Sequence, residues 1–149
     1  MRAVIQRVKS SSVSVEGEVC GKIERGLNVL IGFAEDDTLE DLKYICDKII
    51  NLRIFHDNDD KMNLSVKDIK GEILVISQFT LYGDCRKGRR PNFMKAKGGK
   101  EAISLYEKFL DIISEYSLKI QSGVFGADMK VDICNDGPVT ILLDSKRNF

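Results

Sequence analysis

The sequence predicts a single α+β domain spanning residues 1–149, in which curled, largely antiparallel β-sheets form a barrel-like core with two main amphipathic helices outside. Three observations lead to this expectation. Apolar runs typical of strands lie in the first, middle and last thirds of the chain. Two segments between them show helical spacing, and no repeat, linker or low-complexity segment divides the chain. The expected order of elements is β-β-β-α-β-α-β-β.

The first third is expected to form three strands. Residues 3–8 have a strand-like pattern, and apolar positions on either side of Glu16 and Gly17 indicate a hairpin turn there. Gly26 then precedes an apolar run at residues 27–33 that is typical of an interior strand.

The two helices are expected at residues 38–51 and about 100–117. Thr38 is a good N-cap with acidic residues in the turn behind it, and the apolar residues that follow recur at helical spacing. The second segment carries an aromatic stripe that most simply packs in the core. A short strand is expected at residues 52–55.

The central strand ends in an unusual polar cluster. Residues 73–76 form a continuous apolar run, which is typical of a buried strand, and Ser77, Gln78 and Thr80 follow at once. Buried polar groups cost free energy unless they are paired. The cluster therefore needs either hydrogen bonds to neighbouring backbone or a ligand, and the residues alone leave both readings open.

The final third returns to β structure. Strands are expected at residues 119–122, 124–129, 130–134 and 139–143, with a turn at residues 135–138.

Charge is balanced overall but unevenly distributed. The formal net charge is zero, yet residues 86–100 hold seven basic residues and no acid. A basic loop on a neutral body predicts an anionic partner that docks at one place. The competing reading is a surface loop that only aids solubility.

No metal, disulfide or membrane signal stands out. The four cysteines are far apart with no CxxC pair, which favours a reducing cytoplasm over a disulfide framework. The N-terminus lacks the apolar segment of a signal peptide, and no run is long enough to span a membrane. Residues 57–60 fail the calcium-loop template and read as a solvated turn, and His56 is the only histidine.

The usual catalytic motifs are absent, but two polar segments are distinctive. These are Ser77-Gln78-Phe79-Thr80-Leu81 and residues 135–140, which read NDGPVT. With them, collinear matches along the whole chain make the sequence resemble the D-aminoacyl-tRNA deacylases. The further matches are residues 1–8, 51–55, 61–63, 87–91 and 126–129.

The resemblance implies a homodimer with two active sites at its interface. The SQxTL segment, with Ser77, Gln78, Phe79 and Thr80, would line the pocket for the aminoacylated 3′ end. Gly137-Pro138 would carry a cis peptide bond and enter the partner's pocket, where its backbone would reject L-aminoacyl groups. The resemblance also suggests Phe125 and Met129 for an adenosine pocket, although a core role is a close alternative for each.

The implied reaction is hydrolysis of the ester bond of D-aminoacyl-tRNA, and of glycine mischarged on tRNA-Ala. Backbone N–H groups at Phe79 and Thr80 are expected to stabilise an oxyanion or bind ribose. A 2′-hydroxyl of the substrate is preferred over Thr80 Oγ as the assisting group, because no base is evident near the threonine.

We expect no cofactor and no metal. The expected partners are tRNA and a second copy of the chain, with neither DNA nor a membrane. Phosphate contacts are expected from the basic loop, namely Arg86, Lys87, Arg89 and Arg90. Two alternatives are a related editing deacylase for L-threonyl-tRNA and a non-catalytic tRNA-binding module.

Overall fold

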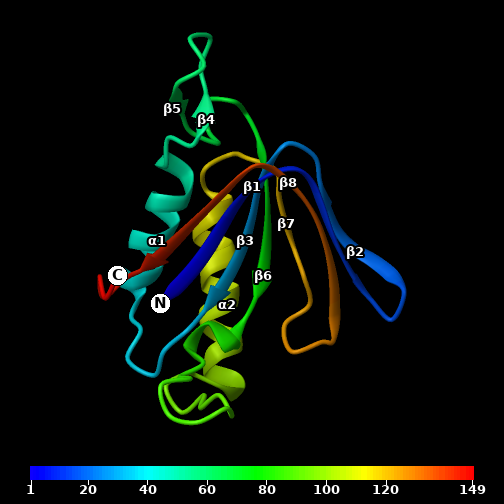
Figure 1. Ribbon diagram of the computed structural model, residues 1–149. Helices are drawn as coiled ribbons and strands as arrows, with labels where there is room; N and C mark the ends of the chain where they lie inside the picture. The colour runs from blue at the N-terminus through cyan, green and yellow to red at the C-terminus, as the bar shows by residue number, and fades with distance from the viewer.

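The computed structural model describes all 149 residues and has the expected α+β architecture (Figure 1). A curled six-stranded sheet is covered on one face by two helices, and a two-stranded hairpin projects from one end. The elements are β1 (Arg2–Val15), β2 (Glu18–Ile23), β3 (Gly26–Gly32), α1 (Leu39–Asn51), β4 (Phe55–His56), β5 (Met62–Leu64), β6 (Glu72–Ser77), a 3₁₀ helix (Phe79–Tyr82), α2 (Gly99–Ser114), β7 (Ile120–Ser122) and β8 (Met129–Asp144).

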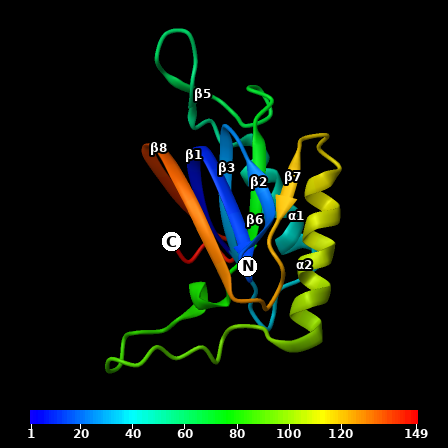
Figure 2. The ribbon, with the colours of Figure 1, turned by 90° about the vertical axis from the view of Figure 1, so that its right-hand side faces the viewer.

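Strand β1 is the hub of the sheet. It pairs antiparallel with β3 through residues 2–8, with β2 through residues 11–15, and with β8 along most of its length. Strands β3, β6 and β7 are parallel neighbours, and α1 and α2 lie in the connections between them. Both helices therefore lie on the same side of the sheet, as Figure 2 shows.

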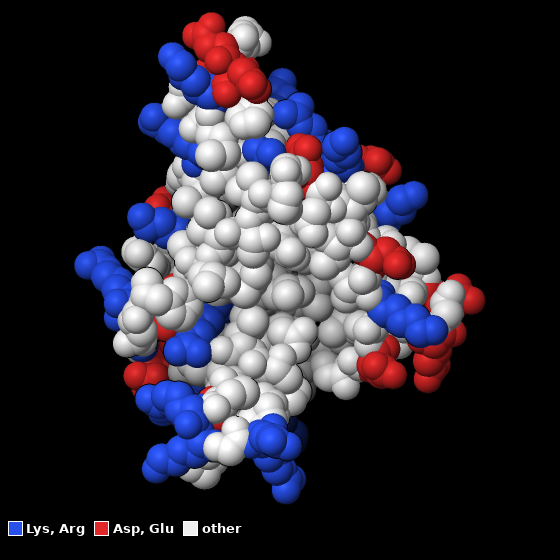
Figure 3. All heavy atoms as spheres, in the orientation of Figure 1, with Lys and Arg blue, Asp and Glu red and all other residues white.

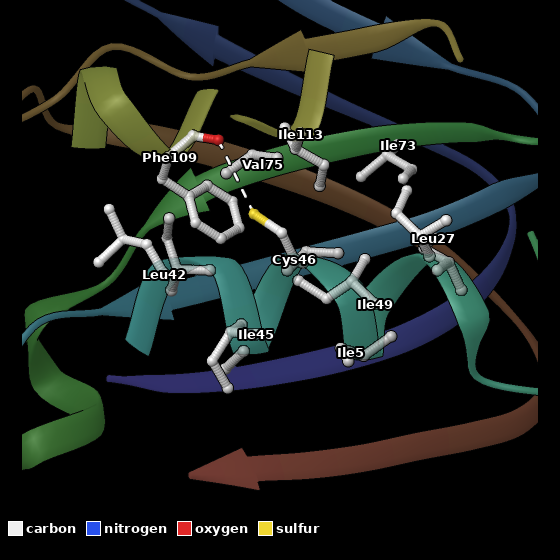
Figure 4. Close-up of a cluster of buried hydrophobic side chains, with 14 of the residues drawn as sticks. Ile5, Leu27, Leu42, Ile45, Cys46, Ile49, Ile73, Val75, Phe109 and Ile113 are labelled. Carbon is white, nitrogen blue, oxygen red and sulfur yellow. Dashed lines mark hydrogen bonds between the residues drawn. The ribbon is translucent and has the colours of Figure 1, made fainter. Parts of the chain in front are cut away.

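Two hydrophobic clusters hold the layers together. The larger one lies between the sheet and the helices, where Ile73 and Val75 of β6 meet α1 and α2 (Figure 4). The smaller one lies on the opposite face and includes Leu74 and Ile76. Successive residues of a strand point to opposite faces, so β6 is buried on both sides. This explains its continuous apolar run.

Most of the expected elements are confirmed. Glu16 and Gly17 form the β1–β2 turn, both with positive φ, and residues 27–33 overlap β3. At the start of α1 the backbone N–H and the hydroxyl of Thr38 both donate to Asp41, at 2.8 and 2.9 Å. Helix α2 ends at Ser114, three residues earlier than expected.

Three expectations about the strands were wrong. In the segment 52–55 only Phe55 is in a strand, and residues 124–128 form a turn, with Gly126 at φ +76°, before β8 begins at Met129. The predicted turn at residues 135–138 lies inside β8. Its partner β1 is long enough to pair on both sides of it, and the register shifts opposite Val8, so the extra residues form a bulge.

The β4–β5 hairpin contains the acidic turn. The carboxylate of Asp57 accepts hydrogen bonds from the backbone N–H groups of Asp59 and Lys61, at 2.9 and 3.0 Å. His56 lies 3.2 Å from the carboxylate of Asp60. The chain contains no cluster of three potential metal ligands, and none of its helices has the length and apolar character needed to cross a membrane.

Candidate active site

The SQxTL segment leaves the sheet where β6 ends. Ser77 still pairs with Ile31, and the Gln78 N–H donates to the Ile31 carbonyl at 2.6 Å, before the chain turns into the 3₁₀ helix. Gly32 permits this close approach, because a Cβ at that position would lie 2.7 Å from the Gln78 carbonyl oxygen. The segment is thus fixed by the backbone of β3.

A cavity of about 300 Å³ lies between this segment and residues 125–131. It brings together five of the residues singled out from the sequence, and nine of its fourteen lining residues are hydrophobic. The five are Ser77, Gln78, Phe79, Phe125 and Met129. Such an apolar hollow with a few polar groups at one edge is typical of a small-ligand site.

Tyr106 of α2 supports the far wall of the cavity. Its hydroxyl donates to the Val75 carbonyl at 3.1 Å, and its ring packs against Phe125 with 5.5 Å between ring centroids. Burial raises the pKa of Tyr106 to about 12, so its hydroxyl stays protonated as a donor. Met129 packs over Gly123, where a Cβ would lie 2.5 Å from its sulfur.

Thr80 lies beside the cavity but does not line it. Its side chain is exposed, and the Gln78 side-chain amide donates a hydrogen bond to its hydroxyl oxygen. An amide donor cannot remove a proton. The single histidine, which could, is on the β4–β5 hairpin at the other end of the molecule (Figure 1).

Gly137 and Pro138 are exposed on β8 and do not line the cavity of their own chain. Their peptide bond is cis, and Gly137 has φ +123°, a conformation that L side chains rarely adopt. The structure therefore does not bring the two signature segments together within one chain.

Arg7, which no sequence motif pointed to, holds the Gly137 segment in place. This buried side chain donates to the carbonyl of Ile54 at 2.6 Å and to the carbonyl of Asp136 at 3.1 Å. The alternation of inward and outward residues along β1 could have revealed that Arg7 is buried. Ala3 and Ile5 point into the core, and Arg7 is the next residue in that series.

The basic loop lies next to the SQxTL segment. The ring of Phe93 packs edge-on against the ring of Phe79, with 5.2 Å between the ring centroids. Basic side chains gather at the lower end of the face shown in Figure 3. All four predicted phosphate contacts are exposed, but Arg86 is paired with Asp84, and this pairing lowers the pKa of that carboxyl. The other three, Lys87, Arg89 and Arg90, form no ion pair within the chain.

Comparisons with known proteins place this chain among the aminoacyl-tRNA ester hydrolases. Residues 4–144 match the model of the family described as D-Tyr-tRNA(Tyr) deacylase. The chain belongs to this family.

Individual relatives agree over the full length of the chain. A Clostridium beijerinckii protein named D-aminoacyl-tRNA deacylase is 74% identical over all of both chains, and a Clostridium perfringens protein of the same name is 62% identical over all of both. A solved structure titled c-Myc DNA Unwinding Element Binding Protein is 44% identical, with a TM-score of 0.91 over 97% of this chain and 98% of that one. A second, titled as a probable eukaryotic D-amino acid tRNA deacylase, is 19% identical with a TM-score of 0.82 over 95% and 97%, and shares the fold.

Proposed function

We propose that the chain hydrolyses the ester bond of D-aminoacyl-tRNA and releases the free D-amino acid and tRNA. Besides membership of the family, one structural observation supports the proposal. Segments 77–79 and 125–129, distant in sequence, line a single cavity that a polar strand end closes on one side. The apolar wall suits a nucleoside, and the polar edge suits the ester.

The chemistry demands little from side chains. An aminoacyl ester is already activated by its neighbouring ammonium and its vicinal 2′-hydroxyl, so positioning and an oxyanion site can suffice. We assign the oxyanion or ribose contact to backbone N–H groups at Phe79 and Thr80, since the first N–H groups of a helix lack partners within it. The hydrogen bond that the Gln78 side-chain amide donates to the Thr80 hydroxyl oxygen argues against a threonine nucleophile, because this donor cannot accept the hydroxyl proton.

The proposed site needs a second copy of the chain. Gly137 and Pro138 are exposed and outside their own cavity, so any pocket they shape belongs to another subunit. Strand β8 pairs only with β1, which leaves its other edge, sixteen residues long, unpaired. Leu142 on this strand is 57% exposed. A long edge with unpaired backbone N–H and carbonyl groups favours association.

In the proposed dimer the Gly137-Pro138 backbone faces the α-carbon of the aminoacyl group. It would collide with a side chain on the L face and leave a D side chain free. Glycine has no side chain to reject, so glycyl-tRNA-Ala would also be hydrolysed. The exposed bases Lys87, Arg89 and Arg90 would contact tRNA phosphates.

Two other functions remain as alternatives. An editing deacylase for L-threonyl-tRNA would act on the same class of ester. A non-catalytic tRNA-binding module would use the basic loop alone, and the name of the 44% identical structure, c-Myc DNA Unwinding Element Binding Protein, makes duplex DNA a second ligand for that test.

The test is deacylation of matched D- and L-tyrosyl-tRNA by the purified chain. We expect release of D-tyrosine with L-tyrosyl-tRNA left intact. Hydrolysis of L-threonyl-tRNA instead would favour the first alternative. Binding of tRNA or duplex DNA without release of any amino acid would favour the second.

The proposed dimer has its own test, because light scattering should give twice the chain mass of 16.8 kDa. An active monomer would contradict the shared site.

A further inference from the structure

Lys97 is the single charged residue among the fourteen that line the cavity. It was counted only as part of the basic segment in the sequence, but the structure separates it from the exposed bases. Its side chain is 11% exposed, whereas Arg86 is 80% exposed. A cation on a largely apolar wall needs an explanation from either the fold or a ligand.

The backbone fixes Lys97 at the end of β3. Its N–H donates to the Phe33 carbonyl at 2.8 Å, and the neighbouring Ala96 forms a bridge with Ala34. Phe33 is itself part of the cavity wall. The backbone position of Lys97 beside the cavity is therefore set by the sheet and not by a free loop.

The acidic partners of Lys97 hold it weakly. Its Nζ lies 2.9 Å from Glu101 and 3.8 Å from Glu35, whose side chains are 79% and 65% exposed. Such carboxylates stay hydrated and their attraction is screened, so another anion can replace them at low cost. The hydrogen bond that the Lys97 ammonium donates to the Glu101 carboxylate raises the pKa of Lys97, so the amine is charged at neutral pH.

The charges on the proposed substrate then determine which part can face Lys97. The aminoacylated end of a tRNA carries an ammonium on the amino acid and a phosphate on the 5′ side of the terminal adenosine. A lysine repels the first and attracts the second. We infer that Lys97 binds this terminal phosphate and so orients the ester toward the SQxTL segment, an inference that rests on the proposed function of the same cavity.

The test uses non-hydrolysable analogues in which an amide replaces the ester of 3′-D-tyrosyl-adenosine. One analogue carries a 5′-methyl phosphate, which has the single charge of an internucleotide linkage, and the other has a free 5′-hydroxyl. Titration calorimetry on the full-length protein measures both affinities. Wild type is expected to prefer the phosphate form by about tenfold, the size of one charge-assisted hydrogen bond.

Lys97→Met should remove this preference and leave affinity for the nucleoside analogue unchanged, while Lys97→Arg should retain it. Lys100→Met is the matched control, because Lys100 is exposed and outside the cavity lining, and its preference should stay as in wild type. Equal weakening of both analogues in Lys97→Met, or an unchanged preference, would overturn the inference. Binding does not require turnover, so a protein that binds as expected but does not hydrolyse D-tyrosyl-tRNA would contradict the proposed function alone.

Discussion

The guanidinium of Arg7 donates from Nε to the backbone carbonyl of Asp136, 3.1 Å away, and so connects the core of β1 to the segment that carries Gly137-Pro138. A second bond from Nη1 reaches the carbonyl of Ile54 at 2.6 Å. A Cβ at Gly137 would lie 2.8 Å from the third nitrogen, Nη2. Two of the three guanidinium nitrogens therefore donate to backbone carbonyls, and the exposed Gly137 segment rests on a buried side chain.

Replacement of this side chain should cost both stability and selectivity. We expect Arg7→Met to lower the free energy of unfolding by about 1–3 kcal/mol, because one buried and one partly buried carbonyl lose their donor. Urea denaturation measures this loss. Discrimination between D- and L-tyrosyl-tRNA should weaken in the same variant, at a temperature where circular dichroism shows it folded. An Arg7→Met protein with wild-type stability would contradict the anchoring role, and Arg89→Ala in the exposed loop is the control for loss of an arginine.

The close approach at Gly32 gives a second prediction. Gly32→Ala should force the Gln78 carbonyl away and lower kcat/KM for D-tyrosyl-tRNA by roughly tenfold to a hundredfold, because small displacements of positioned groups cost large factors in rate. Gly98→Ala is the control, since a Cβ there meets no atom within 4 Å and its φ of −123° suits any residue. Equal activity of the two variants would show that the close contact with Gln78 does not fix the site.

Phosphate contacts by the basic loop should appear in the salt dependence of the affinity for tRNA. If Lys87, Arg89 and Arg90 each contact a phosphate, their replacement by alanine should reduce the slope of log affinity for tRNA against log salt by about 0.7–0.9 per contact. Arg86→Ala should have a smaller effect, because Asp84 already neutralises that side chain. Binding measured by filter retention across salt concentrations provides the slopes. An unchanged slope in the triple variant would assign the loop to solubility.

Ionisation of Asp41 should make the free energy of unfolding depend on pH. Burial opposes its ionisation, but hydrogen bonds from Ser145, Thr38 and Lys146 outweigh burial and hold the pKa of Asp41 well below its ordinary value of 3.8. A depressed pKa contributes stability that is present above the unfolded value and is lost as pH falls through the folded value. The free energy of unfolding should therefore fall between about pH 5 and pH 2, and less steeply in Asp41→Asn. The same slope in both proteins would assign the acid sensitivity to other carboxylates.

Local patterns in the sequence predicted the parts of the fold that depend on local chemistry. The cap at Thr38, the turn at Glu16 and Gly17 and the buried run of β6 are of this kind. The NDGP segment looked like a turn because turn propensity is local, whereas its place inside β8 depends on pairing with β1, more than a hundred residues away.

The candidate site was predictable in a similarly uneven way. Ser77 and Gln78 were singled out because polar groups follow a buried strand, while Phe125 and Met129 came from resemblance alone. Arg7 and Lys97 were missed for different reasons. The alternation that places Arg7 inside was readable but unused, and the half-buried state of Lys97 arises only when residues 96 and 97 attach to the end of β3.

The most direct measurement is the initial rate of deacylation of D-, L- and glycyl-tRNA by wild type, Gly137→Ala, Pro138→Ala and Thr80→Ala, with each fold checked by circular dichroism. Backbone rejection at Gly137-Pro138 predicts that wild type hydrolyses the D and glycyl forms and spares the L form. It also predicts that both variants of this pair lose activity or selectivity, while Thr80→Ala, an exposed side chain outside the cavity, stays close to wild type. Loss of all hydrolysis in Thr80→Ala, with wild-type behaviour in both Gly137→Ala and Pro138→Ala, would contradict the account and make the threonine hydroxyl the nucleophile.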